Sequence, residues 1–186
     1  MEANTVNIHA DLIVRCRNED RSAQFEIYKL YNKAMFNTAL RIIGDENDAE
    51  DVLQDAFVSA FQNLKSYRED ASFGAWLKRI VINKALNQVQ RIKKDLMLAQ
   101  DIKEEANEFE PEKTEPNYTY TVEQVKSAIS ELPSGFRTVL SLYLFEGYDH
   151  KEISEILGIT ESTSKSQYKR AKDKLKMIVT QEVNYG

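Results

Sequence analysis

The stretch DAEDVLQDAFVSAFQNL, residues 48–64, has the most regular pattern in the chain. Its apolar side chains recur at steps of three and four residues, the spacing that places side chains on one face of an α-helix. They are Ala49, Val52, Leu53, Ala56, Phe57, Ala60, Phe61 and Leu64. The pattern predicts a helix with one wholly apolar face, and Asp45 is its expected N-cap.

Helical spacing continues on both sides of this stretch. Residues 12–43 predict two helices separated by the polar segment 18–22. Downstream, residues 65–71 are expected to form a loop, and Ser72 is expected to cap a further helix. The buried stripe predicted for that helix is Phe73, Trp76, Leu77, Ile80, Val81 and Leu86.

The composition excludes several classes of protein. The 186 residues include six glycines and three prolines, too few for the turns of a sandwich or barrel, so an all-α fold is expected. No apolar run approaches the roughly 18 residues that cross a bilayer, and the polar N-terminus does not resemble a signal peptide. With its single cysteine, Cys16, the chain is predicted to be a cytoplasmic protein without disulfides or direct membrane insertion.

Two small helical domains are predicted, at 8–94 and 122–181. Residues 95–121 hold eight carboxylates and two prolines, a composition typical of a flexible acidic linker. In the second domain, Thr121 and Asp149 each begin a capping-box pattern, and Pro133 starts a helix that ends by Gly147. Gly158 then separates a short helix from a last one over about 161–178, which is helix-turn-helix spacing.

The formal net charge of −5 hides strong segregation along the chain. Residues 44–64 carry six acidic and no basic side chains, whereas residues 65–94 carry eight basic and two acidic ones. Such asymmetry indicates different partners for different surfaces.

The last predicted helix is basic, with six basic and two acidic residues over 161–176. In a helix-turn-helix, the start of the second helix enters the major groove, so polar and basic residues there can reach bases or phosphates. The candidates are Ser162, Thr163, Lys165, Ser166, Lys169 and Arg170. The alternative is an ordinary helical hairpin with a solvated basic face.

The helix over 48–64 has an acidic outer face. Its candidate docking residues are Asp48, Glu50, Asp51, Gln54 and Asp55. Carboxylates on one stripe repel one another, which favours a docking surface for a basic partner. A solvated face with favourable charge near the helix N-terminus explains the pattern equally well.

Aromatic, cationic and amide side chains alternate over residues 67–87. Unstacked bases lie on aromatic rings while cations follow the phosphates, so this mixture is typical of a site for single-stranded nucleic acid. The candidates are Tyr67, Arg68, Phe73, Trp76, Lys78, Arg79, Asn83, Lys84 and Asn87. The alternative is that the rings belong to the core, which is favoured for Trp76, whereas Tyr67 is expected to be exposed.

No catalytic motif, metal-ligand cluster or cofactor-binding motif is found in the sequence, so no enzymatic activity, metal or cofactor is predicted. His9 and His150 are interpreted as isolated surface residues.

The signatures DAEDVLQDAF (48–57) and AWLKRIVIN (75–83), followed by the basic helix-turn-helix, resemble the two domains of bacterial RNA polymerase sigma factors. The resemblance is to the extracytoplasmic-function (ECF) type within the sigma-70 family. It covers nearly all of the chain outside the linker and both termini. It implies a dissociable subunit that directs promoter-specific transcription initiation.

The resemblance also implies roles for particular segments. The acidic helix would dock on the clamp coiled coil of the largest polymerase subunit. Residues 67–87 would open the −10 element and hold a flipped base of the melted strand, the last helix would read the −35 element, and residues 136–144 would grip the flap of the second-largest subunit. The acidic linker would run toward the active-site cleft. An anti-sigma factor, often membrane-bound in the family, is a further expected partner.

The sequence departs from the family pattern at two positions of the last helix. Ser164 stands where a core valine is common, and Gln167 stands where an arginine is common, so looser packing of this helix is expected. Two other functions are compatible with the sequence: a helix-turn-helix regulator whose first domain senses a ligand or partner, and an adaptor that retains the fold without binding DNA.

Overall fold

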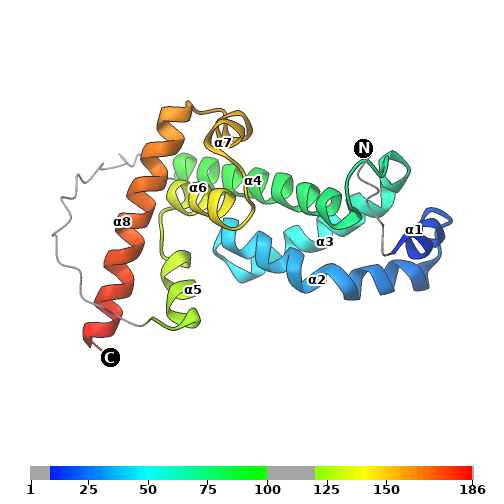
Figure 1. The fold of residues 1–186 in the computed structure, drawn as a ribbon, viewed down its shortest axis with the longest axis horizontal. Helices are drawn as coiled ribbons and strands as arrows, with labels where there is room; N and C mark the ends of the chain where they lie inside the picture. Colours follow the sequence, from blue (N-terminus) through cyan, green and yellow to red (C-terminus); the bar gives the residue numbers. More distant parts are fainter. Residues whose placement is uncertain (1–8, 100–119, 186) are drawn as a thin grey trace, which may run out of the picture. The chain divides into compact units, whose positions relative to one another are not determined.

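The computed structural model describes residues 9–99 and 120–185, and within these ranges all regular secondary structure is helical (Figure 1). The all-α prediction is therefore confirmed. The elements are α1 (Ala10–Arg17), α2 (Arg21–Ile43), α3 (Glu46–Gln62), the 3-10 turn η1 (Leu64–Ser66), α4 (Phe73–Ala99), α5 (Val122–Ser130), α6 (Ser134–Leu144), α7 (His150–Leu157) and α8 (Glu161–Tyr185). The chain divides into two compact units at Arg91.

In the first unit, local signals in the sequence set the ends of the helices. Asp20 accepts hydrogen bonds from the backbone N–H groups of Ser22 and Ala23 at the start of α2. Gly44 ends α2 with a left-handed φ of 84°, and the Asp45 carboxylate then accepts from Asp48 N at 3.0 Å, as predicted for an N-cap. This tight connection returns α3 along α2 (Figure 1).

The core of the first unit is built from the apolar faces of its helices. Its fully buried side chains include Ile13, Ile27, Ile42, Ala56 and Leu77. Cys16 is also buried, and desolvation raises the pKa of its thiol to about 11. The cysteine is therefore a core residue.

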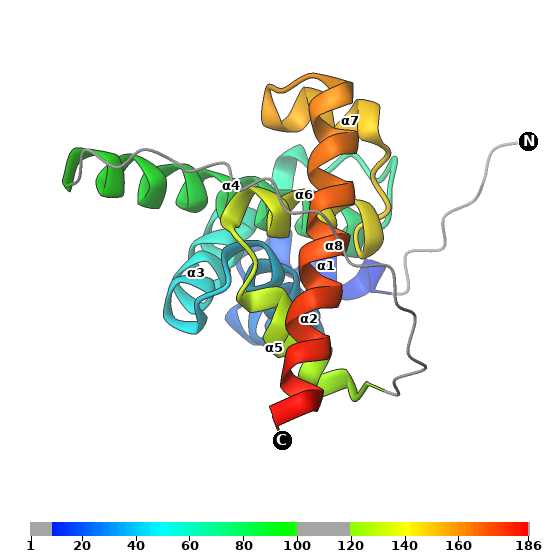
Figure 2. The same ribbon diagram turned by 90° about the vertical axis from the view of Figure 1, so that its left-hand side faces the viewer.

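The second unit packs three shorter helices against α8 (Figure 2). Its core includes Ile129, Leu132, Leu140 and Ala171, and both predicted capping boxes are present. Arg137 is buried and donates from Nη1 to the carbonyls of Ser130 and Leu132 at 2.9 and 2.8 Å. Burial lowers the pKa of its guanidinium. These bonds satisfy carbonyls at the end of α5.

Some element ends differ from the sequence-based expectation. The loop expected over 65–71 begins with η1, α8 continues to Tyr185 rather than to about 178, and α4 continues to Ala99 rather than ending near residue 94. No helix breaker follows residue 94, because DLMLA consists mostly of good helix formers. Most of the expected linker, 100–119, lies outside the described residues, so the domain boundaries stay a prediction. Among the described helices, none is long and apolar enough to cross a membrane.

Candidate polymerase and nucleic-acid interfaces

The acidic stripe, defined as Asp48, Glu50, Asp51, Gln54 and Asp55, lies on the outer side of α3. Four of these residues are exposed, whereas Ala49, Val52 and Leu53 are buried on the opposite face of the helix. The structure therefore has the predicted apolar face and the predicted acidic face on opposite sides of α3.

Asp48 differs from the rest of the stripe. It is half-buried, and its Oδ1 accepts a hydrogen bond of 2.7 Å from Gln88 Nε2 of α4. One predicted docking residue thus also joins α3 to α4, a contact that spacing within α3 could not reveal.

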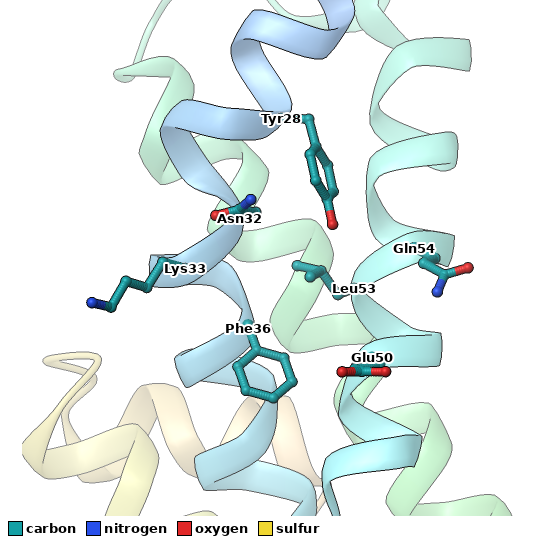
Figure 3. A pocket seen from close by; sticks show the side chains of 7 residues that line it. All are labelled: Tyr28, Asn32, Lys33, Phe36, Glu50, Leu53 and Gln54. Carbon is teal, nitrogen blue, oxygen red and sulfur yellow. The ribbon is translucent and has the colours of Figure 1, made fainter.

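A groove of about 370 Å³ lies beside the acidic stripe, between α2 and α3 (Figure 3). Glu50, Leu53 and Gln54 line its α3 side. The residues from α2 are Tyr28, Asn32, Lys33 and Phe36. These four residues carry no signal in the sequence that links them to the stripe, because their proximity to it follows from the pairing of the two helices.

The aromatic residues around the start of α4 form a cluster. Ring centroids lie 5.6 Å apart for Tyr67 and Phe73, 5.2 Å for Tyr67 and Trp76, and 5.6 Å for Phe73 and Trp76. Trp76 is half-buried at the edge of this cluster. The cluster supplies a ring on which a base could stack, and the ring is fixed by its neighbours.

The predicted exposure of Tyr67 is wrong, since its side chain is 3% exposed. The hydroxyl donates to the Ala71 carbonyl at 2.6 Å, and Arg17 donates to the Tyr67 carbonyl at 2.9 Å. These bonds hold the loop in a conformation in which the Tyr67 ring is buried. Phe73 is also in the core, at 1% exposure, so both rings can support Trp76 but present little surface of their own.

The polar candidates on α4 lie mostly at the surface. Arg79, Asn83 and Asn87 are exposed and, being four residues apart, share one face of the helix. Lys78 and Lys84 are half-buried, and Arg68 is exposed in the preceding loop. The structure therefore brings cations and amides to the surface beside Trp76.

The helix-turn-helix consists of α7 and α8, joined through Gly158 at a φ of 65°. Thr160 Oγ1 accepts from Thr163 N at 3.0 Å and so caps α8. Five of the six candidates are exposed and Thr163 is half-buried. Nζ of Lys165 lies 2.6 Å from Oε1 of Glu161. The hydrogen bond between them, and to a smaller extent the attraction of their charges, lowers the pKa of the Glu161 carboxyl.

Neither histidine is the isolated surface residue that was expected. The His9 ring lies 5.7 Å from the ring of Tyr31, and His150 has partners on two helices. Its ring stacks on Tyr143 with centroids 4.5 Å apart, and its Nδ1 lies 3.0 Å from the hydroxyl of Ser164. Ser164 is completely buried. The serine in place of the family's valine thus has a polar contact, and the expectation of looser packing stays a prediction.

Residues 136–144 on α6 are divided between core and surface. Val139, Leu140 and Leu142 are fully buried. Tyr143, Leu144 and the neighbouring Phe145 are 37, 50 and 45% exposed and form an apolar end to this helix.

Family models match both units. The model of sigma-70 region 2 matches residues 27–95, and that of sigma-70 region 4 matches residues 123–175. The acidic stripe and the α4 candidates fall in the first match, and the helix-turn-helix falls in the second.

Curated relatives are sigma factors as well. The chain is 29% identical over 160 residues to the ECF RNA polymerase sigma factor SigM of Bacillus subtilis, covering 86% of this chain and 96% of SigM. It is 30% identical over 138 residues to the RNA polymerase sigma factor SigZ of the same organism, covering 74% of this chain and 76% of SigZ.

Solved structures share the fold. CnrH, in complex with the cytosolic domain of CnrY, matches with a TM-score of 0.52 and 24% identity, covering 92% of this chain and 96% of CnrH. RpoE of Bartonella quintana, in complex with the anti-sigma factor NepR, matches with a TM-score of 0.55 and 21% identity, covering 83% of this chain and 95% of RpoE.

The chain belongs to the sigma-70 family of RNA polymerase sigma factors, in its extracytoplasmic-function group. Its function is that of a sigma factor, which associates with core RNA polymerase and directs promoter-specific initiation of transcription.

Proposed function

We propose that this sigma factor works through three surfaces: the acidic stripe of α3 for polymerase, the exposed face of α4 for the melted −10 strand, and the start of α8 for the −35 duplex. The observation that carries the proposal is the segregation of exposed charge. Carboxylates gather on α3, whereas cations and amides gather on α4 and α8.

The polymerase surface combines charge with shape. Exposed Asp51 and Asp55 provide negative charge that would attract the basic clamp coiled coil of the largest subunit and orient its approach. The adjoining groove of about 370 Å³, lined in part by Phe36 and Leu53, can accept a side chain of the partner. Leu144 and Phe145, half-exposed at the end of α6, are the corresponding candidates for the flap of the second-largest subunit.

On the −10 side, buried residues would position a ring for stacking, and exposed residues would contact the DNA. Tyr67 and Phe73 hold the Trp76 ring, while Arg68, Arg79 and Asn83 lie at the surface, where phosphates and base edges can reach them. A flipped base would be captured by stacking and hydrogen bonds, so promoter opening would draw on binding energy without catalysis by this chain.

On the −35 side, the start of α8 would enter the major groove. Ser162 and Ser166 are exposed and small enough to allow close approach, and Lys169 and Arg170 can contact phosphates. Lys165 would exchange its Glu161 partner for a phosphate or base. This exchange costs little, because an ion pair between exposed side chains is screened by water and contributes little to stability.

The proposal includes an anti-sigma factor as a regulatory partner and the cytoplasm as the place of action. RpoE was solved in complex with the anti-sigma factor NepR, and CnrH was solved in complex with the cytosolic domain of CnrY; both share this fold. The cytoplasmic assignment is supported by the family, since sigma factors act on RNA polymerase.

The proposal is tested by combining the full chain with core RNA polymerase and a library of randomised promoters. We expect a stable holoenzyme and transcripts that start from a restricted set of sequences containing both a −35 and a −10 motif. A chain that binds DNA specifically but forms no holoenzyme would instead be a helix-turn-helix regulator, and a chain that does neither would be an adaptor.

A further inference from the structure

Ser164 is the one residue over 161–170 of α8 that is completely buried. It lies among candidate DNA-contacting residues: Ser162 precedes it, and Lys165 and Ser166 follow it, all three exposed. Successive helical residues are about 100° apart around the axis, so the direction in which Ser164 is held fixes the directions of these neighbours.

The side chain of Ser164 is held by a hydrogen bond across the helix-turn-helix. Its hydroxyl lies 3.0 Å from Nδ1 of His150, the first residue of α7. A buried hydroxyl without a partner is unfavourable, so this bond favours the arrangement in which the two side chains meet. The serine hydroxyl can donate to or accept from the ring nitrogen.

The direction of the His150 ring is itself fixed. The ring stacks on Tyr143 of α6 at an interplanar angle of 17° and lies 5.6 Å from the ring of Tyr168 on α8. Tyr143 and Tyr168 are in turn 4.5 Å apart. His150 therefore contacts α6 and α8 from the start of α7, and its Nδ1 is aimed at Ser164 by rings on both of these helices.

We propose that His150 and Ser164 are positioning residues that orient α8 for reading the −35 element. The inference rests on the proposed role of α8 and adds two residues that do not face the DNA themselves. The pair replaces the apolar contact that a valine at position 164 would make, and it joins the first turn of α8 to the start of α7 by a hydrogen bond.

The test uses the full chain in holoenzyme with a −35 sequence selected by the wild type from the promoter library. The readout is the ratio of affinities for that promoter and for the same promoter with a scrambled −35 element. Ser164→Val leaves the imidazole nitrogen without the hydroxyl, and His150→Phe keeps an aromatic ring but leaves the hydroxyl unpaired. Each variant is expected to lower the ratio about tenfold, the effect of losing one buried hydrogen bond.

The double variant His150→Phe/Ser164→Val removes both polar groups and restores an apolar pair. It is expected to recover the ratio to within about threefold of the wild type, because no buried polar group is then left unpaired. Ser130→Ala is the matched control, since the Ser130 hydroxyl is exposed and donates to the Ser127 carbonyl of the same helix at 2.6 Å. This control should leave the ratio unchanged.

Two results would overturn the inference. In the first, both single variants melt at lower temperature but keep the wild-type ratio, so the pair supports stability alone. In the second, the losses add in the double variant, so the residues are not coupled. A wild-type ratio near one would refute −35 reading by α8, and with it this inference, before any variant is compared.

Discussion

Gly74, in the first turn of α4, lies against the ring of Tyr31 on α2. A Cβ atom at this position would lie 3.0 Å from Cε1 of Tyr31. The Tyr31 ring is held between Phe73 and His9, with centroids 5.5 and 5.7 Å away, so it has little room to move. The glycine therefore has a packing reason that outweighs its low helix propensity.

Gly74→Ala is expected to lower the free energy of unfolding by about 1 kcal/mol, because overpacking outweighs the gain in helix propensity. Urea denaturation of the full chain measures this change. Gly135→Ala in α6 is the matched control: its nearest contact would be Gln167 Oε1 at 3.9 Å, an ordinary van der Waals distance. The control should stabilise by about 0.5 kcal/mol, and stabilisation by both variants would contradict this reading of Gly74.

Which residues are buried could be predicted where the helical period was clear, and could not where partners come from distant segments. The apolar face of α3 was correctly predicted, since every turn repeats the pattern. Tyr67 was misjudged because its burial depends on Arg17, fifty residues earlier in the chain, and on the bond to Ala71. The partnership of His150 and Ser164 likewise joins two helices and leaves no periodic signal.

At the scale of the element, α3 separates its two tasks by face. Its buried side contributes to the core, so substitutions at the exposed residues of the acidic stripe are expected to change partner binding without disturbing the fold. Asp48 is the exception, because it also bonds to α4. Helix existence and caps were predictable for this element. The groove beside it was not, since four of its seven lining residues belong to α2.

Asp51→Lys is expected to weaken binding of the full chain to core polymerase about tenfold at low salt, and the difference should shrink as ionic strength rises. A titration of labelled protein with core polymerase, without DNA, measures the dissociation constant. Glu131→Lys makes the same change in net charge at an exposed position at the end of α5 and should leave polymerase binding unchanged. Equal weakening by both variants would mean that net charge, rather than the acidic stripe, controls docking.

At the scale of the whole molecule, the chain has two compact units with separate buried clusters. The net charge of −5 describes neither of them, because acidic and basic residues are gathered on different helices. The all-α class was predictable from the scarcity of glycine and proline, and the order of the helices from the spacing of apolar residues and the capping residues. The ends of α4 and α8 were not, since both helices continue through residues that carry no stop signal.

Two units with separate cores should unfold in two transitions, which differential scanning calorimetry resolves. Leu77→Ala and Leu140→Ala remove matched, fully buried side chains from the first and second unit. Each is expected to destabilise its own unit by about 3–5 kcal/mol and to leave the other transition in place. A single transition that both variants shift equally would contradict independent cores.

The hydrogen bond between His150 and Ser164 also restricts how this sequence can evolve. A change at either position alone leaves one polar side chain without its hydrogen-bond partner, which is unfavourable where the group is buried. We therefore expect the two positions to be epistatic. Among descendants of this chain they should co-vary, with valine at position 164 accompanied by loss of the histidine at position 150.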